Sequence, residues 1–268
     1  MRTVTITDQE FAQFQKLIHG IAGISMSAAK KPLVSGRLAR RLAHHGVGSY
    51  ADYFRILQDD STRGELQIAV DLLTTNETFF FREPKHFDFL REQILPKAKP
   101  GQTFRLWSAA SSSGEEPYTL AMVMAEHLGE AAWDILGSDI STRVLDKART
   151  GLYPMERARG LAPASLRAHC LKGVGSQEGC FMIDPALRRR VRFAQINLNE
   201  TLPDVGEFDA IFLRNVMIYF QTETKRQVVA RLLTKLRPGG LFMVGHSESL
   251  NGLAEGLETL APSIYRKP

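Results

Sequence analysis

The stretch "FRLWSAASSSGEEPYTLA", Phe104 to Ala121, decides the fold. Its first residues, "FRLWSA", are typical of a buried β-strand, and "EEPYTLAMVMAEHLG" follows with the pattern of a helix. Nucleotide-binding folds normally place a glycine-rich turn at such a junction, where the backbone cradles phosphates. Here the junction holds one glycine, Gly114, and then two acids, Glu115 and Glu116. Carboxylates at a helix N-terminus repel a pyrophosphate, so the sequence disfavours a dinucleotide cofactor.

The two acids have a simpler structural interpretation, because "SSGE" and "SGEE" both match Ser-x-x-Glu capping boxes. We expect Glu115 to act mainly as a helix cap. We expect Glu116 to cap the helix and also to receive a positively charged group of a ligand. A nucleoside with a cationic tail fits this junction, and S-adenosylmethionine has ribose hydroxyls, an ammonium group, a sulfonium and no phosphate.

Strands and helices alternate from Phe104 onward, which predicts an α/β fold with a mostly parallel sheet. The later strands are "WDILGSDI", "VRFAQIN", "FDAIFLRN", "RPGGLFMVG" and "SIYRKP". The stretch from about 155 to 190 is too long for one crossover loop. It contains a short helix, a glycine-bearing turn and an apolar run, so we predict a small inserted β-subdomain there.

The first hundred residues have helical patterns only. Thr7 and Glu10 form a capping-box pair, and Phe11, Phe14 and Ile18 follow with helical spacing. The predicted division is therefore a helical domain at 1–80, a linker helix at 81–100 and a ligand-binding α/β domain at 101–268.

Composition narrows the class of protein. The 268 residues contain no apolar run of 18 or more, and the N-terminus lacks a signal-peptide core, so we expect no membrane insertion. Only two cysteines occur, Cys170 and Cys180, which favours a cytoplasmic location. No cluster of cysteine and histidine has ligand spacing, so no metal site is predicted.

The net charge of +5 comes from the N-terminus, where residues 1–50 hold seven Lys or Arg and two acids. A basic segment of this kind favours an acidic partner, although a solvated helix face would give the same count. Arg37, Arg40 and Arg41 lie on one side of a predicted helix and are the candidates for such a contact.

Polar residues follow several predicted strands: Asp139, Asn197, Arg214 and Asn215. Ligands of open α/β sheets bind outside the carboxyl ends of the strands, so these side chains should converge. A carboxylate at Asp139 suits two ribose hydroxyls. It could equally cap the helix that starts near Ser141, and the two roles are compatible.

Several long motifs resemble the chemotaxis receptor glutamate methyltransferases, the CheR family. They are "KPLVSGRLARRL", "TTNETFFFRE", "LWSAASSSGEEPYTLAMV", "GSDIS" with "VLDKARTGLY", "FDAIFLRNVMIYF" and "RPGGLFMVGHSESL", and together they span essentially the whole chain. The resemblance implies a helical N-terminal domain, a Rossmann-like class I methyltransferase domain and a small β-subdomain. It also implies methyl transfer from S-adenosylmethionine to receptor glutamates, giving glutamate methyl esters and S-adenosylhomocysteine.

The resemblance also implies residue roles. The expected cofactor-binding residues are Asn76, Thr78, Arg82, Glu116, Asp139, Asn197, Leu198, Arg214 and Asn215. Within this set, Glu116 is expected at the methionyl ammonium group, Asp139 at the ribose and Asn197 with Leu198 at the adenine. Arg82 and Tyr219 are expected to be catalytic, whereas Phe79, Phe80 and Phe81 are expected in the core.

The implied partner is the cytoplasmic domain of a chemoreceptor, whose acidic surface would meet Arg37, Arg40 and Arg41. In some members of the family, the exposed strand edge of the β-subdomain binds the receptor's C-terminal peptide, a form of strand addition.

Three other functions share some of these features. A nucleic-acid methyltransferase would explain the basic N-terminus, but that segment lacks interleaved aromatics, and "RNVMIYF" stands where an "NPPY"-type segment would be. A non-catalytic adaptor would not need both Arg82 and Tyr219. A dehydrogenase should bind NAD, which the acids at 115 and 116 disfavour.

Overall fold

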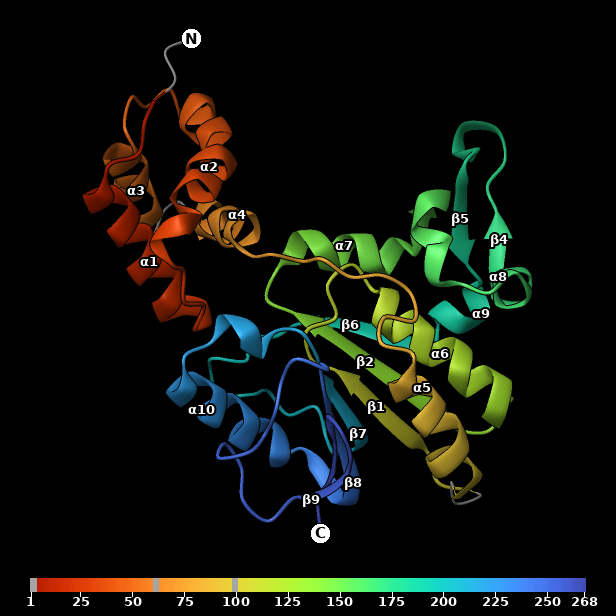
Figure 1. Cartoon of the computed structure of the whole chain (residues 1–268). Coiled ribbons are helices and arrows are strands. Elements are labelled where there is room, and N and C mark those ends of the chain that lie inside the picture. Colours follow the sequence, from red (N-terminus) through yellow and green to blue (C-terminus); the bar gives the residue numbers. More distant parts are fainter. Residues whose placement is uncertain (1–3, 60–62, 98–100) are drawn as a thin grey trace.

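The computed structural model describes residues 4–59, 63–97 and 101–268 and contains three structural parts (Figure 1). Four helices form the N-terminal part: α1 (Asp8–Ala22), α2 (Lys31–His45), α3 (Tyr50–Gln58) and α4 (Arg63–Leu73). Their apolar faces enclose a separate core around Phe14, Leu38 and Tyr53. The capping box at the start of α1 is confirmed, because Thr7 and Glu10 bond reciprocally. A short 3-10 helix, η1 (Ala28–Lys30), connects α1 to α2.

A seven-stranded sheet forms the second part, in the order β6-β2-β1-β7-β8-β10-β9. The bounds are β1 (Phe104–Ser108), β2 (Trp133–Asp139), β6 (Val191–Gln195), β7 (Phe208–Leu213), β8 (Leu236–Val244), β9 (Glu258–Ala261) and β10 (Ile264–Arg266). The first five strands in the order are parallel to their neighbours, and β10 is antiparallel to both β8 and β9. The predicted mostly parallel sheet is confirmed, and its strands bring their carboxyl ends to one edge.

Helices cover both faces of this sheet. Leu106 and Phe212 pack toward α6 (Glu115–Leu128), whereas their neighbours Trp107 and Leu213 pack toward α10 (Thr222–Leu233). Both strands are apolar on both faces, which is the pattern of a sheet buried between helix layers. The remaining helix of the sheet, α7 (Thr142–Thr150), follows β2.

The third part is the predicted insertion. Its strands β3 (Leu152–Pro154), β5 (Cys180–Ile183) and β4 (Cys170–Lys172) form an antiparallel sheet in that order. The short elements η5 (Met155–Gly160), α8 (Pro163–His169), η6 (Gly175–Gln177) and α9 (Pro185–Arg188) complete it. Tyr153 and Phe181 join the core beside α6, so the insertion is packed onto the main domain.

The segment expected as a linker helix is helical from Lys85, as α5 (Lys85–Phe89), a π-helical turn η3 (Leu90–Ile94) and a 3-10 turn η4 (Leu95–Lys97). Phe87 and Leu90 are buried in the core of the sheet domain. This segment therefore packs as a structural layer of that domain.

Residues 74–84 connect α4 to α5 without forming a helix or a strand, and we call them the strap. Figure 1 shows the strap running from the N-terminal helices to the far side of the sheet domain. Among the described helices, none is both long and apolar enough to cross a membrane.

Candidate active site

A cavity of about 360 Å³ lies at the carboxyl edge of the parallel strands. Strand ends, the strap and the segments around residues 22–33 and 215–220 line it. Its lining contains every residue for which sequence analysis predicts a cofactor-binding or catalytic role: Asn76, Thr78, Arg82, Glu116, Asp139, Asn197, Leu198, Arg214, Asn215 and Tyr219. Arg37, Arg40 and Arg41 are not part of the lining.

Asp139, at the end of β2, is 7% exposed and has both carboxylate oxygens occupied by backbone donors. Ser112 N–H donates to Oδ2 at 2.9 Å, and Ser141 N–H, at the start of α7, donates to Oδ1 at 2.9 Å. Asp139 thus supports the start of α7, as expected from the sequence. An ionised carboxylate has about four lone-pair sites, so these bonds leave room for a ligand hydroxyl. Burial raises the pKa of Asp139 to about 6, and the charge of Asp71 adds to that rise.

The predicted capping boxes at Glu115 and Glu116 are wrong. Helix α6 begins after Gly114, which has φ 95° and provides no side-chain cap. A Cβ there would lie 2.8 Å from the Cβ of Ala148, so the tight turn requires glycine. Because Gly114 rather than a serine holds the N-cap position, the Ser-x-x-Glu spacing does not align. Glu115 instead accepts a bond from the Ser113 hydroxyl at 2.7 Å.

Glu116 points to a buried arginine. It accepts bonds from the Ser108 hydroxyl at 2.7 Å and from Arg214 Nη1 at 2.7 Å. The Arg214 side chain is 1% exposed and also donates to Glu83 at 3.0 Å and to the carbonyl of Arg82. Burial raises the pKa of Glu116, and Arg214 opposes that rise. Arg214 therefore joins the sheet to the end of the strap.

One group of described residues has the geometry of a metal site: Glu83, His86 and His246 offer ligand atoms within 4.8 Å of one another. The Glu83 carboxylate, however, already accepts from Arg214, Asn215 and the backbone N–H of His246. The positive charge of Arg214 at 3.0 Å from that carboxylate opposes a cation there. Burial lowers the pKa of His86 to about 3, so its ring is neutral. We assign a structural role to this group, which supports the Arg214 network.

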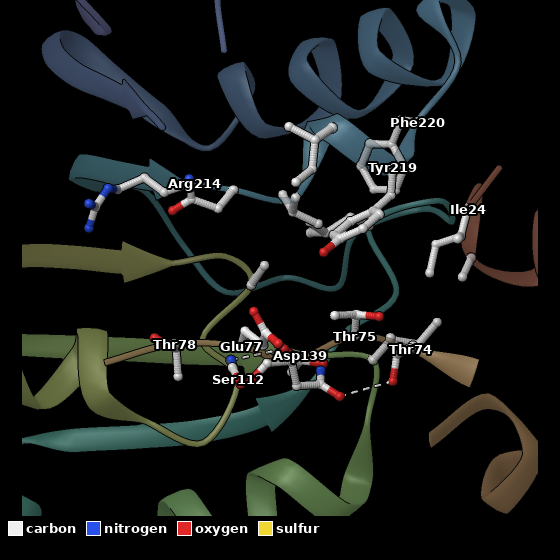
Figure 2. Close-up of a pocket in the computed structure, with 18 of the residues that line it drawn as sticks. Ile24, Thr74, Thr75, Glu77, Thr78, Ser112, Asp139, Arg214, Tyr219 and Phe220 are labelled. Atoms are coloured by element: carbon white, nitrogen blue, oxygen red, sulfur yellow. Dashed lines mark hydrogen bonds between the residues drawn. The ribbon is translucent and has the colours of Figure 1, made fainter. Parts of the chain in front are cut away.

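Tyr219 lies across the cavity from the first residues of the strap (Figure 2). Figure 2 shows Tyr219 and Phe220 on one side and Thr74, Thr75, Glu77 and Thr78 of the strap on the other. Burial raises the pKa of Tyr219, with a contribution from Glu77, so the phenol remains protonated and can donate a hydrogen bond. Arg82 donates to the carbonyl of Glu77 at 3.0 Å, and no described carboxylate forms an ion pair with it.

The expectation that all three phenylalanines lie in the core fails at Phe79. Phe80 is fully buried and Phe81 packs against the same core, but Phe79 is 50% exposed and lines the cavity. The cause is the irregular backbone, since Phe81 and Glu83 have φ values of 55° and 57°. These left-handed residues turn the chain, so three consecutive aromatics point in different directions.

Part of the lining comes from the N-terminal domain and carried no local signal in the sequence. Ile24 forms an isolated antiparallel bridge with Phe220, and Ser25 N–H donates to the carbonyl of Tyr219 at 2.8 Å. Asn197 donates to the carbonyl of Ile21 at 2.7 Å, so its amide group also holds this segment in place. Such pairings join residues almost two hundred positions apart, which only an alignment of relatives could have indicated.

The three predicted substrate-binding arginines have different environments. Arg41 forms an ion pair with the buried Glu65, with Nε at 2.8 Å from Oε1. Arg37 donates to backbone carbonyls at the start of the strap, including that of Thr74 at 2.9 Å. Arg40 is exposed, and its substrate role and those of the other two stay predictions.

Comparisons with known proteins agree with this architecture. The family model "CheR methyltransferase, SAM binding domain" matches residues 76–265, and "CheR methyltransferase, all-alpha domain" matches residues 9–74. The "Chemotaxis protein methyltransferase 2" of Pseudomonas aeruginosa is 40% identical, with 97% of this chain and 93% of that protein covered. The "Chemotaxis protein methyltransferase" of Escherichia coli is 39% identical, with 98% and 92% covered. The cofactor expected from the junction after β1 is thus confirmed as S-adenosylmethionine, and the chain belongs to the CheR family of chemotaxis methyltransferases.

Proposed function

We propose that this chemotaxis methyltransferase modifies glutamate side chains of chemoreceptors, forming glutamate methyl esters and S-adenosylhomocysteine. The observation that carries this proposal is the position of Arg82. Its guanidinium lines the cavity that holds Asp139 and Glu116, and no described carboxylate pairs with it. A substrate carboxylate can supply the missing partner by charge-assisted hydrogen bonds.

The donor set of the cavity suits the cofactor. Asp139 can accept both ribose hydroxyls, and Glu116 can accept from the ammonium group while it keeps its bond to Arg214. Apolar side chains, among them Ile196 and Leu198, offer a surface for the adenine ring. S-adenosylmethionine, when bound, supplies a methyl group made electrophilic by the sulfonium.

The reaction requires little proton transfer by the protein. A glutamate side chain with a pKa of about 4.3 is already ionised near neutral pH, so no general base has to remove a proton. A carboxylate oxygen forms the new bond to the methyl carbon as the carbon–sulfur bond breaks. Arg82 would orient the carboxylate, and the protonated Tyr219 would donate to it, so the work of the site is alignment and exclusion of water.

The deciding experiment transfers labelled methyl groups to membranes that contain chemoreceptors from the same organism. We expect label in the receptor band and release of the label as methanol in mild alkali, as a methyl ester requires. Alkali-stable label in RNA or DNA would overturn the proposal.

Arg82→Ala and Tyr219→Phe should each lower kcat, by roughly tenfold or more, while Tyr219→Phe keeps the affinity for S-adenosylhomocysteine. Unchanged kcat in both variants would contradict the catalytic roles.

Two surfaces support a receptor as the acceptor. The exposed Arg40 gives the N-terminal domain a cation for an acidic helix surface. On the inserted sheet, β4 is an edge strand with Leu171 exposed, and Val174 is exposed two residues beyond its end. This edge would bind a receptor's C-terminal peptide by strand addition. Calorimetric titration with that peptide tests the second contact, and a proline placed in the peptide's paired segment should abolish it. The two free cysteines fit a reducing cytoplasm, where the receptor's signalling domain would lie.

A further inference from the structure

The strap has no helix or strand of its own, yet its backbone carbonyls are occupied one after another by side chains. Arg37 donates to Thr74, Ser112 to Asn76, Arg82 to Glu77, Arg157 to Thr78 and Arg214 to Arg82. Backbone groups outside regular structure need such partners, and here four of the five donors are arginines. Arg82 belongs to the strap itself. The other four donors come from other segments, which therefore help to set the conformation of the strap.

Arg37 holds the first end and comes from α2 of the N-terminal domain. Its Nη1 lies 2.9 Å from the carbonyl of Thr74 and 3.3 Å from that of Leu73. Its Nη2 lies 3.4 Å from the hydroxyl oxygen of Thr75. A planar guanidinium presents its donors from separate nitrogens in a fixed fork, whereas all three donors of a lysine lie on one nitrogen.

Arg157 holds the middle and comes from η5 of the inserted subdomain. Its Nη1 lies 2.8 Å from the carbonyl of Thr78 and 3.3 Å from Oε1 of Glu115, whose side chain is buried. Gly160, in the same 3-10 helix, allows the closest approach: a Cβ there would lie 1.8 Å from the carbonyl oxygen of Phe80. The inserted subdomain therefore packs directly against the strap.

We propose that Arg37 and Arg157 are positioning residues, which fix the strap from two different domains in the conformation that binds the cofactor. Neither arginine lines the cavity, but Thr78, which Arg157 contacts, and Asn76, which lies between the two contacts, both do. The inference rests on the cofactor rather than on the identity of the methyl acceptor. It gives Arg37 a task other than contact with a receptor, and it makes the inserted subdomain part of the cofactor site.

The test uses the full-length protein and S-adenosylhomocysteine as the probe, with affinity measured by calorimetry. Arg37→Ala and Arg157→Ala should each weaken binding, by roughly tenfold, because a hydrogen bond from a charged donor is lost. Arg40→Ala and Arg159→Ala are the matched controls, since each removes one exposed positive charge from the same element. Both controls should bind the probe like the parent protein.

Conservative variants separate positioning from charge. Arg157→Lys should recover most of the affinity, because a single ammonium can still donate to the carbonyl of Thr78. Arg37→Lys should recover less, because its three acceptors require the fork of the guanidinium. Equal recovery in the two lysine variants would contradict the assigned geometry.

Two results would overturn the proposal. One is that Arg157→Ala and Arg37→Ala bind the probe as tightly as their controls do. The other is a lowered Tm with unchanged affinity well below Tm, which would show a purely structural role. Label transfer is not part of this measurement, so a failure of the glutamate assignment would leave it unaffected.

Discussion

The cavity has two walls that are built in different ways. The turn after β1, residues 109–116, is fixed by its place between a strand and a helix, and its Ser112 N–H bonds to Asp139 on the neighbouring strand. The strap on the other wall is fixed by side chains from α2, the turn, η5 and the segment after β7. The strand-to-helix backbone shapes most of the first wall, with support from the Asp139 carboxylate and the Tyr153 hydroxyl, whereas side chains from several elements shape the second. A substitution remote from the ligand should therefore affect the strap more than the turn.

The largest expected effect comes from Arg214, which bonds to both walls. Arg214→Met leaves Glu83 and Glu116 without their shared counter-charge in a buried position. We expect the free energy of unfolding in urea to fall by about 3–5 kcal/mol at pH 7. Arg226→Met is the control, because its side chain is 53% exposed and it pairs with an exposed acid, so the loss should stay below about 0.5 kcal/mol. Similar losses of unfolding free energy in both variants would show that Arg214 does not stabilise the contact between the two walls.

The second-largest effect is expected at the first wall, where the turn after β1 meets Asp139. Asp139→Ala removes the carboxylate expected at the ribose, so affinity for S-adenosylhomocysteine should fall by roughly a hundredfold. The backbone of the turn also loses the acceptor for Ser112 N–H. Asp146→Ala, an exposed acid on α7, serves as the control in the same calorimetric titration. An unchanged affinity in Asp139→Ala would mean that another residue binds the ribose.

The raised pKa of Asp139 predicts a pH dependence at the same wall. The ionised carboxylate is the better acceptor for hydroxyl groups, and protonation near pH 6 removes it. Affinity for S-adenosylhomocysteine should therefore decline as the pH falls through about 6, by up to about tenfold per pH unit. Asp139→Asn should lose this inflection. The same inflection in that variant would assign it to another group.

The smallest effect concerns the contact between the walls. Ser112→Ala removes the hydroxyl that donates to the carbonyl of Asn76 at 2.7 Å, but it keeps the backbone bond to Asp139. A single neutral hydrogen bond contributes about 1 kcal/mol, so affinity for the product should drop by roughly fivefold. A loss as large as that of Asp139→Ala would contradict this assignment, because it would make this one contact as important for binding as the carboxylate expected at the ribose.

The same difference explains what the sequence could and could not predict. Asp139, Asn197 and Arg214 each follow a predicted strand, so alternation alone placed them at one edge. Asn76, Thr78 and Arg82 came only from a family resemblance. The helical pattern predicted for this region is wrong for the strap, which forms neither a helix nor a strand. The contacts of Arg37 and Arg157 with the strap span 37 and 79 positions, a separation that no local rule reaches. Glu115 and Phe79 were misplaced because turns with left-handed residues redirect side chains.

Several backbone carbonyls in the middle of the strap accept hydrogen bonds from side chains. Among the described residues, no acceptor is recorded for the N–H groups of residues 75–80. Amide hydrogen exchange depends on whether an N–H is bonded, so we expect these amides to exchange quickly even in a well-fixed backbone. Fast exchange would then say nothing about mobility here. Protection that appears only with a bound ligand would make these six amides an intrinsic reporter of occupancy.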